Sequence, residues 1–372
     1  MNDRLLPSNS GPFEVAIEKA LLQRAGAIAY GADAIRGAKL VSPPTSFLPY
    51  LIWEYGLGEL TPYVPNLYDL IRDGIQWQRV RGTFSAIQRG LAWIGYTASI
   101  EEAWHGRNWW NSYQLRFSAL PRSDDPDLER IEAIASLSVA KRSQLRRGVF
   151  QYDVEAGVAD KNRFDGAMFD RSSGVRVTPA GTLWSFGRTA EFSQVLTEVE
   201  GEALGIWVPP VTGETLLWVD MTFPWATATF PWATSATAQR AILMASFFQT
   251  QRIYVAFKDA FGEVIGYRRA RANHAVNLVS GGIYKVGNDS FSPSATGQIA
   301  YIECMTDFED AFGITAAEVS LVIGPTLAAG VPTGRLWLDP DHLSGGVEIM
   351  KQAVSIPLRK TVREQLKFLV RF

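Results

Sequence analysis

The residue types that usually perform catalysis or bind metals are scattered through this sequence. The three histidines, His105, His274 and His342, lie far apart, and none has a cysteine or a second histidine at a metal-ligand spacing. A zinc site is therefore not expected, because zinc needs several such ligands together. The single cysteine, Cys304, cannot form an intramolecular disulfide, which favours assembly in a reducing compartment.

Phosphate-binding and nucleophile motifs are absent from the sequence, and the paired carboxylates give no evidence of catalysis. The sequence contains neither G-x-x-x-x-G-K-[ST] nor G-x-S-x-G. Asp339-Pro340-Asp341 could hold a cation, but Asp and Pro are turn residues, and we favour a turn. Glu101-Glu102 and Glu198/Glu200 cannot be assigned to acid–base catalysis, because the two carboxylates of a hydrolase meet only in the fold. We predict no catalytic residue, cofactor or metal.

The composition indicates a globular chain with more than one domain. A length of 372 residues allows two or three domains, and 47% hydrophobic residues can build a sizeable core. The net charge of -2 argues against a nucleic-acid binder, which normally has a basic excess. No apolar run approaches the roughly 20 residues that span a membrane, and the first residues lack a signal-peptide pattern.

Residues 46–120 are predicted to contain the elements around which the chain is organised. Apolar residues at helical spacing predict three helices, over residues 46–56, 66–80 and 84–94. In the second, Leu67, Leu70, Ile71 and Ile75 form a buried stripe, with Gly74 on the same side. Ser46 is a candidate N-cap of the first, Gly82-Thr83 turns and recaps the chain before the third, and Gly95 suits its C-terminal end.

Alternating residues then predict a β-hairpin. Residues 113–119 alternate apolar and polar side chains, and residues 99–104 are the expected partner strand. A further helix is predicted from Leu128 towards Arg147, with Gly148 as its stop. Its basic residues favour a dipole-complementing helix end over a nucleic-acid site, and they are Lys141, Arg142, Arg146 and Arg147.

Residues 12–35 are predicted to form one amphipathic helix. Its apolar residues recur every three or four positions, so that one face carries Phe13, Ile17, Ala20, Leu21 and Ile28. This face either joins the helices of a partner protein in a bundle or packs on its own domain. The pattern does not decide between these two interpretations.

The second half is predicted to be β-rich. Short apolar runs separated by Gly, Pro and Thr favour a β-sandwich with a helix or two, and residues 252–269 favour a hairpin. The runs are 204–208, 216–221, 253–257, 264–267, 275–279, 299–304 and 319–323. Near the end, Leu358, Val362, Leu366 and Leu369 have helical spacing. The predicted class is thus α+β, with a helical first half that contains a hairpin.

A seven-residue repeat places two Phe-Pro-Trp-Ala-Thr segments in succession. It brings Trp225 and Trp232 close together in the chain, and its prolines exclude a regular helix. Exposed, these aromatic residues would form a docking strip for another protein. Buried, they would be two turns that cover the β-core.

Several short motifs in order resemble the phage tail protein I family, the smaller wedge subunit of contractile-tail baseplates. This family is related to the small wedge subunits of R-type pyocins and type VI secretion baseplates, and the resemblance covers about residues 1–178. The motifs are Leu5-Leu6-Pro7, Phe47-Leu48-Pro49-Tyr50-Leu51-Ile52-Trp53-Glu54, Arg79-Val80-Arg81-Gly82-Thr83, Ala103-Trp104 with Trp109-Trp110, and Gln151-Tyr152-Asp153-Val154 with Arg163-Phe164-Asp165-Gly166 and Ser173-Gly174-Val175-Arg176. The chain departs from the family at Arg81, where Lys is common, and in continuing to Phe372.

The resemblance implies a structural role in the tail baseplate of a virion, assembled in the host cytoplasm. The chain would sit beside two copies of the larger, baseplate J-type wedge protein, contact neighbouring wedges and anchor a tail fibre. It implies three domains: a bundle helix over 1–40, a family domain over 41–178 and a β-rich extension over 179–372. The predicted partner-binding residues are Phe13, Ile17, Leu21, Trp225 and Trp232.

A glycan-binding or glycan-cleaving tail-tip protein is the alternative. Twelve tryptophans and a β-rich second half would suit stacking against sugars. Assays of residues 179–372 on cell-wall and capsular glycans would separate these functions.

Overall fold

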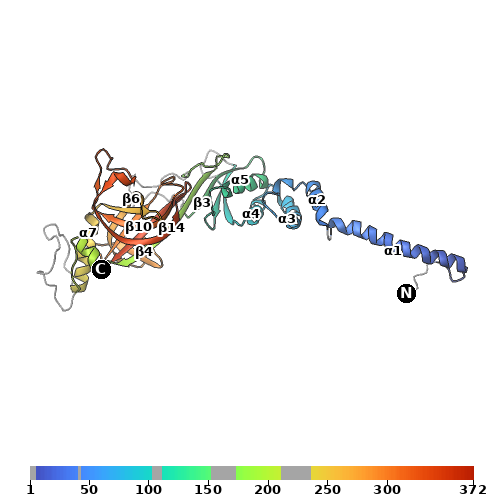
Figure 1. The fold of residues 1–372 in the computed structure, drawn as a ribbon, viewed down its shortest axis with the longest axis horizontal. Helices are drawn as coiled ribbons and strands as arrows, with labels where there is room; N and C mark the ends of the chain where they lie inside the picture. The colour runs from blue at the N-terminus through green and yellow to red at the C-terminus, as the bar shows by residue number, and fades with distance from the viewer. Residues whose placement is uncertain (1–5, 41–42, 103–110, 152–172, 211–235) are drawn as a thin grey trace. The chain divides into compact units, whose positions relative to one another are not determined.

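The computed structural model describes residues 6–40, 43–102, 111–151, 173–210 and 236–372. Helices dominate the first part of the chain and strands the second, which confirms the predicted α+β class (Figure 1). The chain folds as two compact units: residues up to 95 together with 137–140, and residues 96–136 together with 141–372. The division at residues 40 and 178 that the family resemblance implied remains a prediction.

The first unit is helical. Its elements are α1 (Pro12–Leu40), η1 (Thr45–Phe47), α2 (Leu48–Glu54), η2 (Gly58–Leu60), α3 (Leu67–Val80) and α4 (Phe84–Trp93). The prediction that Ser46 caps a helix is wrong, because Ser46 lies inside η1 and α2 starts after Phe47 without a side-chain cap. Asn66 caps α3 instead, since its Oδ1 accepts a hydrogen bond from the Tyr68 N–H at 3.0 Å.

Trp77 lies at the centre of this unit. Its side chain is 2% exposed, and its indole N–H donates to the Ser138 hydroxyl at 3.0 Å. On the same helix Leu70 and Gly74 are buried as predicted, and Leu57 packs so closely against Gly74 that a Cβ there would lie 2.9 Å from it. The sequence stripe identified the buried face of α3 but missed its largest member.

The turn between α3 and α4 has the predicted glycine but not the predicted cap. Gly82 has a φ of 91°, which an L-residue rarely adopts. Thr83 occupies the N-cap position of α4, yet its hydroxyl donates to the Val80 carbonyl at 2.7 Å and accepts nothing from α4. Gly95 follows α4 with a φ of 80°, as predicted.

The second unit begins with the predicted hairpin, β1 (Ala98–Glu102) and β2 (Ser112–Phe117), paired antiparallel. The helix predicted to reach Arg147 is wrong in its second half. α5 (Asp127–Ser138) ends early, and the chain continues as β3 (Gln144–Phe150), parallel to β2. Lys141 and Arg142 lie in the intervening turn. The physical reason is burial: Arg147 is inaccessible and donates to the Ser173 carbonyl at 2.8 Å.

Most strands of the second unit form one large mixed sheet, with main strand order β1-β2-β3-β4-β15-β9-β6-β5-β10-β14. β7, β8 and β12 pair beside this path, and β11 and β13 form a separate two-stranded sheet. The β-rich second half is confirmed, but the large sheet takes the place of the predicted sandwich. Its elements are β4 (Leu183–Val195), α6 (Glu198–Ala203), α7 (Ala236–Thr250), β5 (Ile253–Lys258), β6 (Val264–Leu278), β7 (Tyr284–Val286), β8 (Asp289–Pro293), β9 (Ile299–Met305), β10 (Thr315–Ile323), β11 (Thr326–Leu327), β12 (Trp337–Leu338), η5 (Pro340–His342), β13 (Leu343–Ser344), β14 (Val347–Pro357) and β15 (Val362–Arg371).

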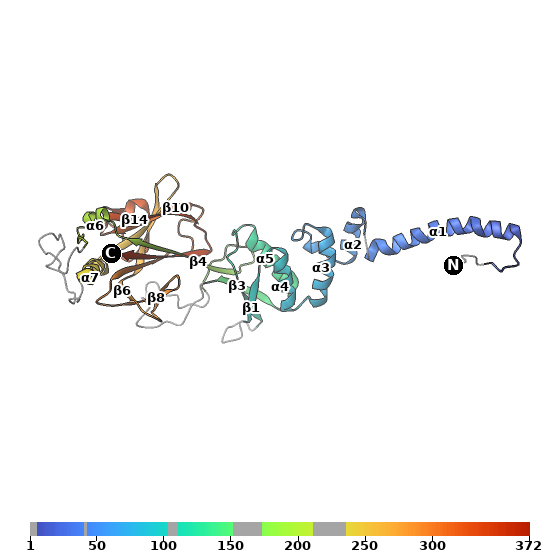
Figure 2. The same cartoon turned by 90° about the horizontal axis from the view of Figure 1, so that it is seen from below.

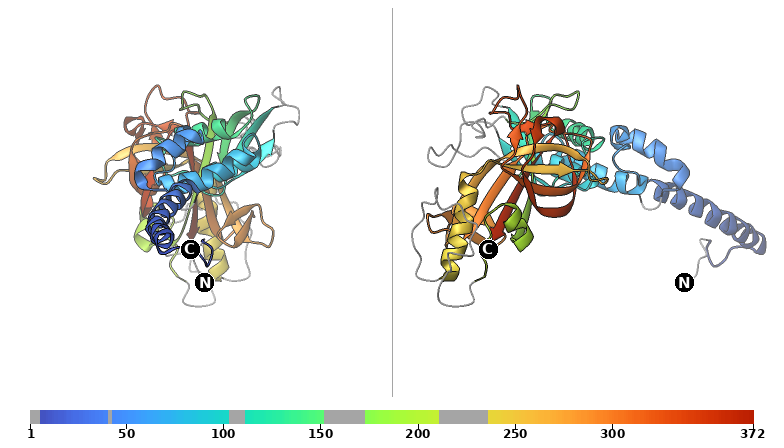
Figure 3. Two further views of the ribbon diagram at one scale, coloured as in Figure 1. Left: turned by 90° about the vertical axis from the view of Figure 1, so that its right-hand side faces the viewer. Right: turned by 60° about the vertical axis from the view of Figure 1, so that its left-hand side comes forward.

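This sheet curves (Figure 3), so that β14, the last strand in this order, approaches β4. The Gln352 amide on β14 donates to the Gln194 amide oxygen on β4 at 2.7 Å. Arg188 Nη2 on β4 donates to the Pro357 carbonyl at 3.0 Å. The enclosed side chains from β5, β9, β10, β14 and β15 form a single apolar core. α7 lies beside the end of β15 (Figures 1 and 2), where the Phe248 and Phe372 rings are 5.7 Å apart.

Besides the sandwich, two predictions in this half are wrong, and the other apolar runs that can be compared lie in strands. The terminal segment predicted as helical is β15, because Leu366, Phe368 and Val370 face the core at every second position. The run 204–208 is irregular chain after α6, although Ile206 and Val208 are fully buried. The β5–β6 hairpin is confirmed, and the remaining apolar runs lie in β5, β6, β9 and β10. The run 216–221 lies outside the described residues.

Candidate interaction site

α1 has a well-defined start. Pro12 occupies its first position, where a missing N–H is harmless. The Glu14 carboxylate accepts from the Gly11 N–H at 2.9 Å, and the Glu18 carboxylate accepts from the Leu6 N–H at 3.1 Å. These bonds hold the preceding residues against the first turns, and the acidic groups complement the helix dipole.

The three residues predicted to bind a partner through α1 are all exposed. Phe13 is 76%, Ile17 43% and Leu21 57% accessible. Their spacing of four residues places them along one face of the helix, and we call these three residues the α1 face. Large apolar side chains that remain in water on one helix face are typical of a protein-interaction surface.

The other predicted partner-binding residues, Trp225 and Trp232, lie outside the described residues. Whether the repeated segment forms a docking strip stays a prediction.

The sequence reasoning missed a second exposed surface, on η1 and α2. Phe47, Tyr50 and Trp53 are exposed, whereas Leu48, Leu51 and Ile52 are buried. The Phe47 and Tyr50 ring centroids lie 6.1 Å apart. The available signal was that this helix is apolar on both sides, which leaves one side without a core to face.

The residues with catalytic potential have structural partners. His274 stacks on Tyr284 with centroids 5.7 Å apart. Asp339 caps η5, and its carboxylate lies 3.3 Å from Arg335, which agrees with the turn interpretation. Glu200 completes the capping box of α6. Across the described ranges, no three potential metal ligands gather at one place, and His105 lies outside those ranges.

Cys304 is buried in the core of the second unit. Burial raises the pKa of its thiol to about 12, so that the group remains protonated near neutral pH. A protonated, inaccessible thiol is a poor nucleophile.

Two partly buried ion pairs hold the start of β15 to its surroundings. Glu364 is buried, and Arg188 donates to its two oxygens at 2.8 and 2.6 Å. Burial raises the pKa of Glu364 in spite of these opposing hydrogen bonds. Before β15, Arg359 Nε donates to Asp124 at 3.0 Å and ties the loop ahead of α5 to the sheet. These carboxylates are committed to arginine partners.

α1, the longest described helix, is not apolar enough to cross a membrane, and no other helix in the described part of the chain qualifies either.

Comparison with known proteins identifies the region that contains the α1 face. Residues 6–143 match the family model described as phage tail protein (Tail_P2_I). Baseplate protein I of Escherichia phage P2 is 29% identical over 124 residues, which cover 32% of this chain and 67% of the phage P2 protein. The family match runs from α1 to the turn before β3. Residues 6–143 of this chain are therefore similar to the phage tail protein I family, as the sequence motifs predicted.

Proposed function

We propose that this chain is a structural subunit of the baseplate of a phage or phage-like contractile tail, and that it acts by assembly and not by catalysis. The family match over residues 6–143 carries this proposal. The similarity to a protein named baseplate protein I supports the location in the tail of the virion.

Within the baseplate, α1 docks onto the helices of the larger, J-type wedge protein. Each wedge contains two copies of that larger protein. The α1 face supports this contact, because it is a row of large apolar side chains that the chain leaves in water. Burying each such side chain contributes about 1.5–3 kcal/mol before the entropy of association is subtracted. Together the three side chains would contribute about 4.5–9 kcal/mol to the contact before that cost.

Residues beyond the family match supply a second contact, to a neighbouring wedge or a tail fibre. Residues 144–372 follow the match and contain most of the large sheet. This extra part is where we place a function that other members of the family lack.

The test co-expresses the full chain with the larger wedge protein of the same tail and measures co-purification. Phe13→Ala, Ile17→Ala and Leu21→Ala are combined, because alanine keeps the helix and removes only the apolar contacts. The matched control combines Lys19→Ala and Tyr30→Ala, which lie on the opposite side of α1 at 3.6 residues per turn. Loss of an interface anchor costs about 2 kcal/mol or more, so the triple variant is expected to lose the partner.

Circular dichroism and size-exclusion chromatography establish that both variants are folded. Equal co-purification of the triple variant and the control would show that α1 does not dock through this face. A wild-type chain that never associates with the larger wedge protein would refute the baseplate assignment itself.

A further inference from the structure

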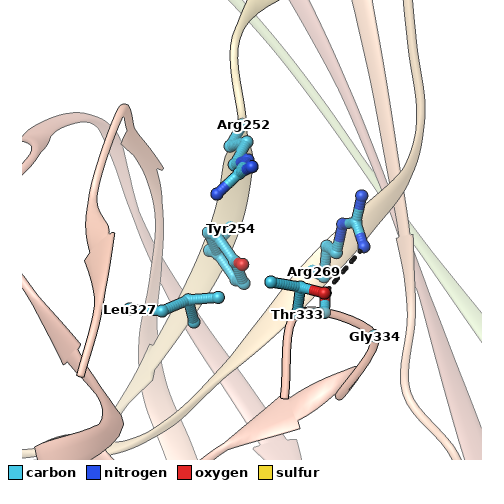
Figure 4. A pocket seen from close by; sticks show the side chains of 6 residues that line it. All are labelled: Arg252, Tyr254, Arg269, Leu327, Thr333 and Gly334. Carbon is cyan, nitrogen blue, oxygen red and sulfur yellow. Dashed lines mark hydrogen bonds between the residues drawn. The ribbon is translucent and has the colours of Figure 1, made fainter. Parts of the chain in front are cut away.

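A pocket of about 280 Å³ lies on the outer face of the β5–β6 hairpin. Its lining residues are Arg252, Tyr254, Arg269, Leu327, Thr333 and Gly334 (Figure 4). Tyr254 and Arg269 are direct partners across the two strands. Arg252 precedes Tyr254 by two positions and therefore lies on the same face of the sheet.

The pocket is held in place by the segment that crosses over these strands. The Tyr254 side chain is 1% exposed and packs in a small apolar cluster with Leu338 and Leu343. Arg269 is fixed twice: its backbone N–H donates to the Leu336 carbonyl at 3.0 Å, and its Nη1 donates to the Thr333 carbonyl at 3.2 Å. Figure 4 shows this second bond as a dashed line between Arg269 and Thr333.

The charge in the pocket is not neutralised. Within the described residues, neither Arg252 nor Arg269 has a carboxylate within ion-pair distance, and no carboxylate lines the cavity. The next residues behave differently: Arg268 lies 3.0 Å from Asp310, and Arg271 lies 3.7 Å from Glu303. Two guanidinium groups that share a cavity without a counter-charge create a positive potential there.

We propose that this pocket binds the carboxylate or phosphate group of a sugar-sized organic anion. Guanidinium groups suit both anions, because their planar donors can bind two oxygens at once. The pocket volume of 280 Å³ is room for roughly nine waters at about 30 Å³ each, more than a bare anion needs. Leu327, which is only partly buried, offers apolar surface for the neutral body of the ligand.

The ligand class is tested with three probes that share one ring: glucose, glucuronate and glucose 6-phosphate. Titration of the full chain is followed by ligand-observed NMR and calorimetry at low ionic strength. At least one anion is expected to bind one-to-one, and glucose at least tenfold more weakly. Comparing glucuronate with glucose 6-phosphate distinguishes a carboxylate from a phosphate ligand. Added salt is expected to weaken binding, because the attraction is ionic.

Variants then assign the binding to the pocket. Arg252→Gln changes an exposed side chain, and Arg269→Gln removes the second charge. Arg371→Gln is the charge-matched control at the end of β15, where Arg371 bonds to Ser193 at 3.1 Å. A lost charged hydrogen bond is worth about tenfold or more in affinity, so Arg252→Gln is expected to weaken anion binding by that factor.

Several results would overturn the proposal: no binding of either anion, equal binding of glucose, or an unchanged affinity in Arg252→Gln. An equal loss in Arg371→Gln would do so as well, because it would indicate general attraction to a charged surface. None of these outcomes bears on the wedge assembly assay, which probes α1.

Discussion

Replacing Gly148 by alanine tests the most unexpected part of the sheet, the buried strand β3. An alanine Cβ at this position would lie 2.3 Å from Cζ3 and 2.5 Å from Cε3 of Trp184, and 3.2 Å from Cε2 of Phe117. Carbon atoms in contact are normally about 3.5–4.0 Å apart, so the indole ring would have to move by about 1 Å or more. Trp184 is fully buried with its ring centroid 5.7 Å from Phe186, which leaves it little room.

The expected net loss of stability is about 1–2 kcal/mol. Overpacking a core costs about 1–3 kcal/mol, and the lower chain entropy of alanine in the unfolded state offsets about 0.4–1 kcal/mol. In a unit of this size, each kcal/mol lowers the melting temperature by about 2–4 °C. Scanning calorimetry of the full chain should therefore show the transition of the second unit about 2–8 °C lower.

Two comparisons make this prediction specific. Gly334→Ala introduces the same methyl group where nothing lies within 4 Å, so only the unfolded-state effect remains and its transition should rise by about 1–4 °C. Trp184→Phe removes the clashing ring atoms, so Gly148→Ala should be less harmful in that background, with a coupling energy of opposite sign to the single losses. A Gly148→Ala protein as stable as the Gly334→Ala control, or no coupling to Trp184, would refute the packing of β3.

Two further predictions concern local interactions in the two units. Asn66→Ala removes the cap of α3 and should cost about 1 kcal/mol in urea unfolding, whereas Thr83→Ala, which caps nothing, should cost clearly less; equal losses would contradict the two geometries. Lys258 bonds to Glu348 and lies 3.1 Å from Glu318. Burial alone would raise the pKa of Glu348, but the Lys258 and Ser320 hydrogen bonds lower it below its ordinary 4.5. Its folded pKa is thus below its unfolded pKa, and the stabilisation is present above about pH 4.5 and lost as the pH falls further. Lys258→Met should therefore destabilise by about 1 kcal/mol at pH 7 and by much less at pH 3, and a pH-independent difference would show that the charges do not interact.

The helices of the first unit could be predicted because their signals are local. Asn66 and Gly95 mark ends of α3 and α4, and the buried Leu70 and Gly74 recur at helical spacing. The hydrogen bond of the Thr83 hydroxyl could not be predicted. The backbone N–H groups of α4, which it could cap, and the Val80 carbonyl, to which it could donate, lie equally near in sequence. Only the final geometry shows that it bonds back to Val80.

β3 and β15 were misread because their environment is set by distant strands. Arg147 sits among residues at helical spacing in the sequence, yet its hydrogen-bond partner Ser173 is 26 positions away. β15 pairs with β4 on one edge and with β9 on the other. Its alternation of buried and partly buried residues is set by this pairing, whereas Leu358, Val362 and Leu366 recur every four positions in the sequence and mimic a helix by coincidence.

The α1 face and the basic pocket also differ in how far the sequence predicts them. The α1 face could be predicted from spacing alone, although only the structure shows that its side chains are exposed. The basic pocket could not, because Arg252 and Arg269 are brought together by strand register, and the loop carrying Leu327 and Thr333 crosses them from about 60 positions later. Their lack of carboxylate partners is likewise a property of the fold.

The sheet also links the family region to the rest of the second unit. β2 lies within the matched residues, and it pairs with β3, which pairs with β4, which pairs with β15 at the end of the chain. This ladder crosses residue 179 without a break, and Arg359 Nη1 adds a bond of 2.6 Å to the Pro121 carbonyl. A load applied near the β5–β6 pocket would reach the β1–β2 hairpin through hydrogen-bonded strands rather than through a flexible linker. The attachment function proposed for the second half would therefore be mechanically continuous with the β1–β2 hairpin.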